Sequence, residues 1–230
     1  MDAALAIRNA DVVSVDGVRR ADVLVDDGLI TAVGPDLSIG SAARTVDASG
    51  RLLCPGFIDL HAHSALRPFD DPLLGAKVGQ DFTTELICPD GLGPAPLTDA
   101  TVGTRRRYLQ GLEPSDAATW EWRSMQSYLD ALQAARPSAN MAACVPHSAV
   151  RESVMGNANR APDRREMSAM KDLVAESLGA GARAVSFGMI YAPGLYAGTD
   201  ELRRLAETAA EYGVPLVPHV RNEAAGVIDS

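Results

Sequence analysis

Histidine placement is the first feature of this chain with chemical consequences. Each histidine lies at or just beyond the predicted carboxyl end of a strand, and the four are His61, His63, His147 and His219. In a parallel βα barrel these strand ends form the active-site face, where residues far apart in the sequence meet. Neutral imidazole is a good ligand for zinc, nickel and iron. The four positions therefore predict a metal site.

His61 and His63 are the most informative pair of the four. Residues i and i+2 of a strand point to the same side, so both imidazoles can hold one cation. Asp59, two residues earlier, shares that side. Two histidines could also meet at a strand end by chance, but the Pro-Gly-Phe-Ile-Asp segment before them makes chance the weaker explanation.

Strand–helix alternation from Pro55 onwards supplies the frame for these side chains. Five apolar runs of strand length follow one another, at residues 57–63, 82–88, 141–145, 182–187 and 214–217. Repeated βα units imply a parallel sheet, either open or closed into a barrel. Neither a Gly-x-Gly-x-x-Gly fingerprint nor a P-loop follows a strand, so a nucleotide-binding sheet has no support.

Helices are predicted between these strands. One is indicated by apolar residues at helical spacing, followed by a proline: Trp122, Met125, Leu129, Leu132 and Pro137. A second begins at a capping box formed by Asp163 and Glu166 and ends near Gly179 and Gly181. Thr199 can cap a third helix, whose buried stripe would hold Leu202, Leu205, Ala206 and Ala209.

The first 54 residues predict a separate β unit. Short apolar or β-branched runs at 12–15, 23–25 and 29–33 read as strands, and Asp27-Gly28 as a hairpin turn. No helical period occurs there. We therefore expect a small domain over 1–54 that carries no chemistry, and a βα domain over 55–230.

Composition limits the function classes. The 230 residues carry a formal net charge of −9, which disfavours nucleic-acid binding. No apolar stretch approaches a membrane span, and the first residues lack the pattern of a secretory signal. The three cysteines are too scattered for a disulfide framework. We expect a globular cytoplasmic protein that acts on a small molecule.

Several segments carry a family resemblance. Pro-Gly-Phe-Ile-Asp-Leu-His-Ala-His at 55–63 resembles the first barrel strand of the amidohydrolase superfamily of metal-dependent hydrolases, and 25–34 resembles its small sandwich domain. Within the superfamily the chain is most similar to the D-aminoacylases, which are N-acyl-D-amino-acid deacylases. Five later segments carry that likeness: 80–86, 120–129, 146–156, 186–194 and 219–223.

The resemblance implies an α/β fold: a (β/α)8 TIM barrel, of which about the first five βα units are present, with a small N-terminal β-sandwich domain. It also implies hydrolysis of N-acyl-D-amino acids by a metal-activated water, with one or two Zn²⁺ per chain. His61 and His63 match the family's first-strand ligands, and His219 matches the ligand at the end of the fifth strand. His147 matches a histidine near the site that is not itself a ligand.

A departure from the family pattern concerns the bridging ligand. Members often carry an Asn-Cys-Gly after the second strand, where this chain has Pro89-Asp90-Gly91. Asp90 could replace the cysteine as a metal ligand, or could simply begin an Asp-Gly turn. Cys88 is the competing candidate, although a buried structural cysteine is the simpler interpretation. The fourth strand has no lysine for a carboxylated bridge, which argues against the cyclic-amide hydrolases.

Three further residues are candidates for substrate binding. Arg151 and Arg221 follow strand-end histidines and could bind a substrate carboxylate, or could pair with a neighbouring acid. Tyr191 could donate a hydrogen bond to the tetrahedral oxyanion, or could be a packed rim tyrosine.

A closed barrel needs eight strands, and this chain predicts five. The resemblance places the proton-shuttling aspartate and a sixth-strand histidine beyond residue 230, so no catalytic acid or base is assigned here. We interpret the sequence as the front part of a longer enzyme, and expect poor solubility of these residues alone. The alternatives are an amidohydrolase of another amide, a deaminase, or a truncated relative without catalysis.

Overall fold

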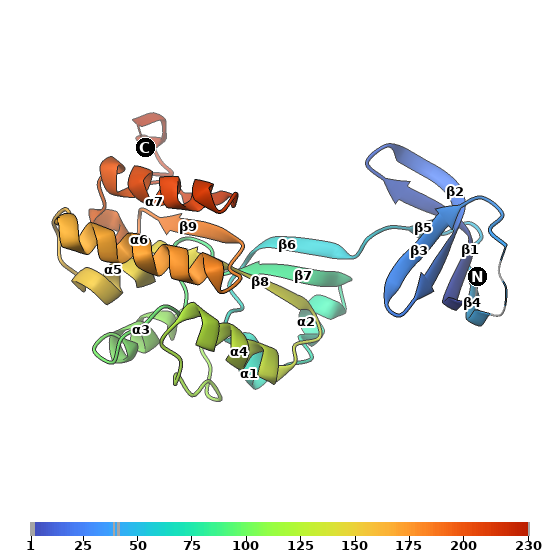
Figure 1. Ribbon diagram of the computed structural model, residues 1–230, viewed down its shortest axis with the longest axis horizontal. Coiled ribbons are helices and arrows are strands. Elements are labelled where there is room, and N and C mark those ends of the chain that lie inside the picture. The colour runs from blue at the N-terminus through green and yellow to red at the C-terminus, as the bar shows by residue number, and fades with distance from the viewer. Residues whose placement is uncertain (1–2, 39, 41, 230) are drawn as a thin grey trace. The chain divides into compact units, whose positions relative to one another are not determined.

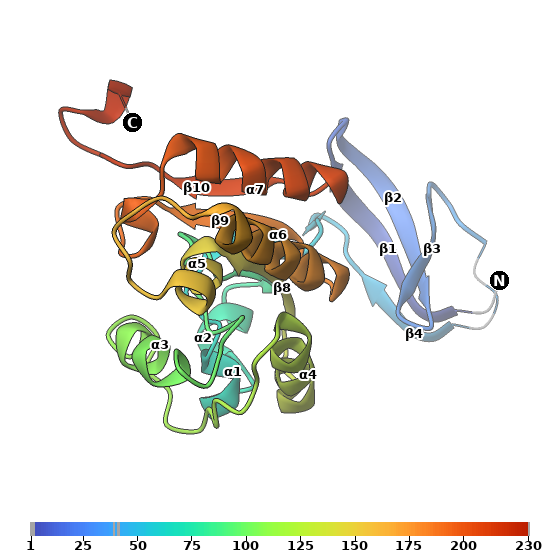
Figure 2. The same ribbon diagram turned by 60° about the vertical axis from the view of Figure 1, so that its left-hand side comes forward.

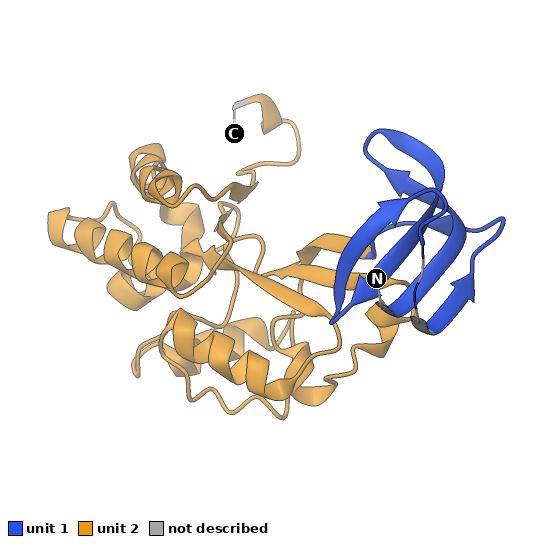
Figure 3. Ribbon diagram, turned by 45° about the vertical axis from the view of Figure 1, so that its right-hand side comes forward, with its two compact units in different colours: residues 1–56 blue, residues 57–230 orange. Residues whose placement is uncertain are grey.

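The computed structural model describes residues 3–38, 40 and 42–229. Contacts divide the chain into two compact units, Met1–Gly56 and Phe57–Ser230, shown in different colours in Figure 3. The division falls close to the expected boundary at residues 54 and 55. Among the described residues no helix is both long and apolar enough to cross a membrane.

The first unit is a five-stranded sheet in the order β3-β2-β1-β4, with β5 also paired to β1. Its strands are β1 (Ala3–Ser14), β2 (Gly17–Asp26), β3 (Leu29–Gly34), β4 (Ala42–Asp47) and β5 (Leu52–Leu53). Asp27 and Gly28 join β2 to β3 with φ angles of 47° and 74°, as a two-residue hairpin turn requires. The described strands form one sheet, so the expected β-sandwich remains a prediction.

The second unit is built on a parallel sheet in the order β10-β9-β8-β7-β6 (Figures 1 and 2). Its strands are β6 (Phe57–Ala62), β7 (Phe82–Ile87), β8 (Asn140–Pro146), β9 (Ala184–Gly188) and β10 (Leu216–His219). Each of the five apolar runs forms one of these strands. Successive strands are neighbours, which is the order of consecutive βα units in part of a TIM barrel.

The described α-helices lie between consecutive strands of this sheet along the chain. They are α1 (Arg67–Asp70), α2 (Gly75–Val78), α3 (Val102–Leu109), α4 (Met125–Ala135), α5 (His147–Met155), α6 (Arg164–Gly179) and α7 (Thr199–Glu211). Two 3₁₀ turns, η1 (Gly194–Tyr196) and η2 (Val227–Asp229), complete the described elements. In Figure 1, α6 and α7 lie side by side along β9. The core of this unit lies between the sheet and these helices.

The helix signals in the sequence are confirmed in part. The Asp163 carboxylate accepts hydrogen bonds from the N–H groups of Arg165 and Glu166, and Glu166 accepts one from the Asp163 N–H, so the capping box forms. Ser124 caps α4, which leaves Trp122 outside that helix. The prediction that Thr199 caps the third helix is wrong. Gly198, which has no side chain to cap with, is the N-cap residue of α7, and Thr199 is the first residue of the helix.

Candidate metal centre

Three side chains converge at the carboxyl ends of β6 and β7. The Nε2 atoms of His61 and His63 each lie 3.1 Å from Oδ2 of Asp90. One ligand atom from each of the three residues lies within 4.8 Å of the others. Two imidazoles and a carboxylate directed at one point are donors that suit a divalent transition metal. The donor set therefore fits the metal that the sequence predicts.

β6 brings the two histidines together by its period of two. His61 lies in the strand and His63 just beyond its end, so both rings leave the same side, with centroids 5.3 Å apart. Asp90 comes from the loop after β7. It has a φ of +55°, a left-handed conformation that aspartate tolerates better than most residues.

Elements far along the chain hold that loop in place. The hydroxyl of Ser186 on β9 donates to the Cys88 carbonyl at 2.6 Å and accepts from the Gly91 N–H at 3.1 Å. The N–H of Ser148 on α5 donates to the Gly91 carbonyl at 3.1 Å. Asp90 therefore depends on β9 and α5 for its position.

A glycine on β9 makes room for the same loop. A Cβ atom at Gly188 would lie 1.7 Å from the Asp90 carbonyl oxygen, which no side chain can do without moving the backbone. The close approach of β9 to the loop thus requires glycine at this position.

The geometry favours Asp90 over Cys88 as the ligand from this loop. Cys88 is fully buried, and burial raises the pKa of its thiol well above the ordinary value, with the nearby Glu113 adding to the effect. The donor group found among the described residues contains Asp90 and not Cys88. Cys54, Cys88 and Cys144 are all free thiols.

Glu113 is a second carboxylate at the centre. It is 4% exposed, its Oε1 lies 3.6 Å from Nδ1 of His63, and its Oε2 accepts a hydrogen bond from the Leu66 N–H at 3.2 Å. The nearby Glu113 carboxylate raises the pKa of His63; burial opposes this, and Asp90 adds a smaller contribution. Sequence reasoning missed Glu113, because it lies in an irregular segment without a strand or helix pattern.

His219 lies apart from the three converging donors. It ends β10, its Nδ1 lies 2.8 Å from the Val220 carbonyl, and its Nε2 lies 3.5 Å from Glu223 Oε1. β6 and β10 are the opposite edges of the described sheet, which explains the separation. The carbonyl contact leaves Nε2 as the nitrogen that can bind a metal. Its place as a fourth ligand remains a prediction.

His147 and Arg151 share one buried partner on α7. His147 Nε2 lies 2.8 Å from Glu201 Oε1, and Arg151 Nε donates to the same oxygen at 3.1 Å. The other guanidinium nitrogens of Arg151 donate to the carbonyls of Ala158 and Arg160, and the residue is 0% exposed. A guanidinium so engaged has no nitrogen free for a substrate carboxylate. We therefore replace the substrate-binding expectation for Arg151 by the ion-pair alternative, with Glu201 as the partner.

Tyr191 and Arg221 are only partly buried, unlike Arg151. Tyr191 lines a cavity of about 250 Å³ together with His63, Leu92 and Tyr108, and its ring centroid lies 5.3 Å from that of His219. Arg221 is half-buried and donates from Nη2 to the Ala197 carbonyl at 2.8 Å. Both residues remain candidates for substrate binding.

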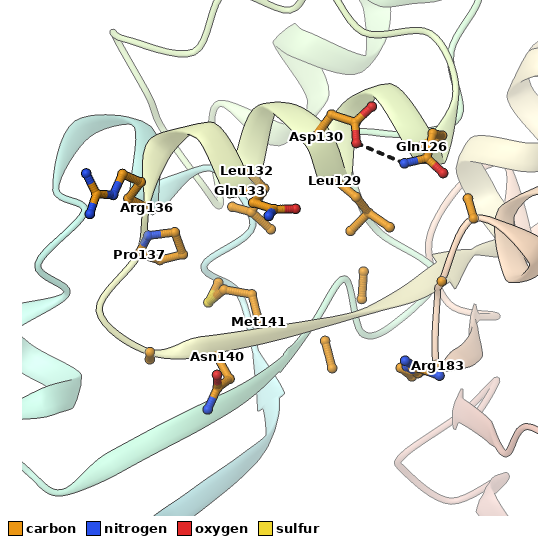
Figure 4. A pocket seen from close by; sticks show the side chains of 15 residues that line it. Gln126, Leu129, Asp130, Leu132, Gln133, Arg136, Pro137, Asn140, Met141 and Arg183 are labelled. Atoms are coloured by element: carbon orange, nitrogen blue, oxygen red, sulfur yellow. Dashed lines mark hydrogen bonds between the residues drawn. The ribbon is translucent and has the colours of Figure 1, made fainter. Parts of the chain in front are cut away.

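A larger cavity of about 520 Å³ lies elsewhere, between α4 and the start of β8 (Figure 4). Asn140 and Met141, at the amino end of β8, form part of its wall, whereas the histidines lie at the carboxyl ends of the strands. Its walls contain no histidine or cysteine. This cavity therefore has no part in the metal centre.

Fold and donor group together define a class: a protein with a parallel βα sheet, consistent with part of a TIM barrel, that carries metal-type ligands at the carboxyl ends of its strands. The chain belongs to the amidohydrolase family, whose model matches residues 44–227.

Known proteins resemble this chain over nearly its whole length. It is 38% identical over 219 residues to the N-acyl-D-glutamate deacylase of Alcaligenes xylosoxydans xylosoxydans, covering 93% of this chain and 43% of that protein. It is 33% identical over 213 residues to the D-aminoacylase of the same organism, covering 91% and 42%.

A solved structure shares the fold. The N-acyl-D-glutamate deacylase of Bordetella bronchiseptica, crystallised with zinc and a phosphonate that mimics the tetrahedral intermediate, superimposes with a TM-score of 0.84 at 35% identity. The match covers 99% of this chain and 47% of that one. The chain thus spans less than half the length of these relatives.

Proposed function

We propose that the protein of which this chain forms part hydrolyses the amide bond of N-acyl-D-amino acids with the help of bound zinc. The observation that carries the proposal is the His61, His63 and Asp90 group, set in a fold shared with a zinc-containing N-acyl-D-glutamate deacylase. Because the chain spans less than half of that relative, the activity is proposed for the whole protein.

His61, His63 and Asp90 would hold the cation, with His219 as a further ligand. A divalent metal at this point would supply Lewis acidity, which polarises the acyl carbonyl and lowers the pKa of water. The Glu113 carboxylate, 3.6 Å from Nδ1 of His63, would favour the tautomer with the proton on Nδ1, which leaves Nε2 as the coordinating nitrogen.

Tyr191 is proposed to stabilise the oxyanion that forms as the carbonyl is attacked. Burial raises the pKa of its hydroxyl, with Asp90 and Glu223 adding to the effect, so the group stays protonated at neutral pH. A protonated hydroxyl can donate a hydrogen bond to developing negative charge. Arg221 is proposed to bind the substrate carboxylate, because its planar guanidinium can form paired hydrogen bonds with it.

The proposed setting is the cytoplasm, with a small N-acyl amino acid as the partner. The net charge of −9 argues against a nucleic acid. An N-acyl-D-glutamate is the first substrate to test, because the relative of that name is 38% identical to this chain.

The deciding experiment uses the full protein, purified with measured zinc content. We expect hydrolysis of N-acetyl-D-glutamate or N-acetyl-D-methionine, little activity on the L-enantiomers, loss of activity on chelation, and recovery on adding zinc. Activity only on other amides or on amine-bearing rings would instead favour a different amidohydrolase or a deaminase. Bound zinc without turnover of any of these compounds would favour a relative that has lost catalysis.

A further inference from the structure

The strand that carries the histidines has an irregular ladder. Asp59 pairs with Glu85 and Ala62 with Ile87, and the register shifts between these two pairs. His61 lies within that interval, on a strand at the edge of the described sheet. Its backbone N–H donates to Oδ1 of Asp59 at 3.0 Å. A side-chain carboxylate therefore binds the backbone of His61 where the ladder is irregular.

A lysine joins that carboxylate to a second one. Nζ of Lys77, from the one-turn helix α2, is hydrogen-bonded to Oδ2 of Asp59 and lies 3.2 Å from Oε1 of Glu85. Glu85 is fully buried, and its other oxygen accepts a hydrogen bond from the hydroxyl of Ser64, the residue after His63. A continuous polar chain thus runs through Asp59, Lys77, Glu85 and Ser64, and its two ends flank His61 and His63.

Charge explains why the lysine matters to this chain of contacts. A buried carboxylate without a partner is strongly unfavourable, and two carboxylates close together repel each other. The ammonium of Lys77 lies beside both carboxylates, so one positive charge offsets the repulsion between Asp59 and Glu85. Asp59 binds the backbone N–H of His61, and Glu85 binds the hydroxyl of Ser64. The two carboxylates therefore hold the segment at both ends of the metal-binding pair.

We propose that Lys77 is a positioning residue for the metal centre. Its ion pairs within the described part of the chain are with Asp59 and Glu85. Through Asp59, and through Glu85 and Ser64, it acts on the backbone of the His61–His63 segment. This inference rests on the proposed metal site. It adds a lysine, in a segment with no recognisable motif, as a determinant of metal affinity.

The test compares four variants of the full protein with the unsubstituted one. Lys77→Met removes the cation, Lys77→Arg keeps it, and Asp59→Ala breaks the chain without stranding Glu85. Lys171→Met, which alters the other lysine of the chain, on α6, is the matched control. Zinc affinity is measured by competition with a chelator, and the visible spectrum of the cobalt-substituted protein reports ligand geometry.

We expect Lys77→Met and Asp59→Ala to weaken zinc binding by about 10–100-fold, the range for groups that orient metal ligands. The cobalt spectrum should change in both, Lys77→Arg should restore most of the affinity, and Lys171→Met should match the unsubstituted protein. If Lys77→Met does not fold, Asp59→Ala decides.

Unchanged affinity and spectrum in Asp59→Ala, or in a folded Lys77→Met, would overturn the inference while leaving the proposed function intact. Failure of the unsubstituted protein to bind zinc would overturn the proposed metal site, and this inference with it.

Discussion

At the scale of single residues, Asp90 is the clearest case of a side chain placed for metal binding. Oδ2 of Asp90 lies 3.1 Å from Nε2 of both His61 and His63, while the thiol of Cys88 is buried and lies outside this donor group. Backbone conformation and the contacts of the loop, rather than the type of side chain alone, decide which of the two candidates reaches the site.

Replacing Asp90 tests this conclusion. We expect Asp90→Cys to retain zinc binding, because a thiolate at the same position is a good zinc ligand. We expect Asp90→Ala to weaken binding by at least about 100-fold, more than the loss of an orienting group. Calorimetric titration with zinc measures both. Asp99→Ala, at an exposed carboxylate, is the control, and equal affinity in Asp90→Ala would exclude Asp90 as a ligand.

Glu113 gives the site a pH dependence with a defined sign. It raises the pKa of His63 above the ordinary value of 6.5, and a metal binds only the unprotonated ring. Zinc affinity should therefore fall as the pH drops through this raised pKa. In the metal-free protein, the stability that protonated His63 contributes is complete below about pH 6.5 and is lost as the pH rises through the folded-state pKa.

The variant Glu113→Gln should shift this profile. Without the carboxylate, the pKa of His63 falls, so the midpoint of the affinity–pH curve moves to lower pH, while affinity at pH 8 weakens by about 10-fold. NMR of the imidazole ring follows the pKa, and chelator competition across pH follows the affinity. Glu121→Gln, at an exposed position, is the control. An unmoved midpoint would contradict the role given to Glu113.

At the scale of elements, α5 and α7 are linked by buried charge. Glu201 lies in the first turn of α7, where an acidic residue is favourable, but it points inward and is 3% exposed. There it serves both His147 and Arg151, the first of which begins α5. The N–H of Ser148 on α5 also donates to the Gly91 carbonyl in the Asp90 loop. The link between α5 and α7 therefore helps to hold this loop in place.

The variant Glu201→Gln tests how much this link contributes to the free energy of unfolding. The amide keeps the shape but leaves the Arg151 guanidinium without its counter-charge, so we expect a loss of about 3–5 kcal/mol in unfolding free energy. Urea denaturation of the full protein measures it. Glu207→Gln, on the exposed side of the same helix, should lie close to the unsubstituted protein. A loss no larger than that of the control would show that the buried charge is compensated elsewhere.

At the scale of the whole molecule, the site depends on contacts between distant parts of the chain. The loop after β7 is held by Ser186 from β9 and by Ser148 from α5, and Gly188 leaves room for its backbone. Parallel βα units make this possible, because they bring the carboxyl ends of all the strands to the same end of the sheet.

Gly188→Ala tests that long-range contact. The new Cβ would lie 1.7 Å from the Asp90 carbonyl oxygen, so β9 or the loop must move. We expect weaker zinc binding, by about 10-fold or more as for other disturbed ligand supports, together with a lower melting temperature. Gly179→Ala is the control, since a Cβ there meets nothing within 4 Å. Unchanged zinc affinity in Gly188→Ala would show that the loop adapts without moving Asp90.

The sequence by itself determined the features that depend on local pattern. Five apolar runs became the five parallel strands, Asp163 and Glu166 formed their capping box, and the spacing of His61 and His63 put both rings on one side of β6. These follow from strand and helix periods, which a short stretch of sequence contains in full.

Only the tertiary structure decided which other groups join the histidines. It placed Asp90 rather than Cys88 beside the histidines, added Glu113 from an irregular segment, and paired Arg151, a candidate for substrate binding or an ion pair, with Glu201. It also connected Lys77 to both carboxylates beside the metal-binding pair. Each of these contacts joins residues brought together by strand order and loop conformation, and burial then sets their charge. Sequence spacing contains neither the distance nor the burial, so such contacts emerge only when the chain is folded.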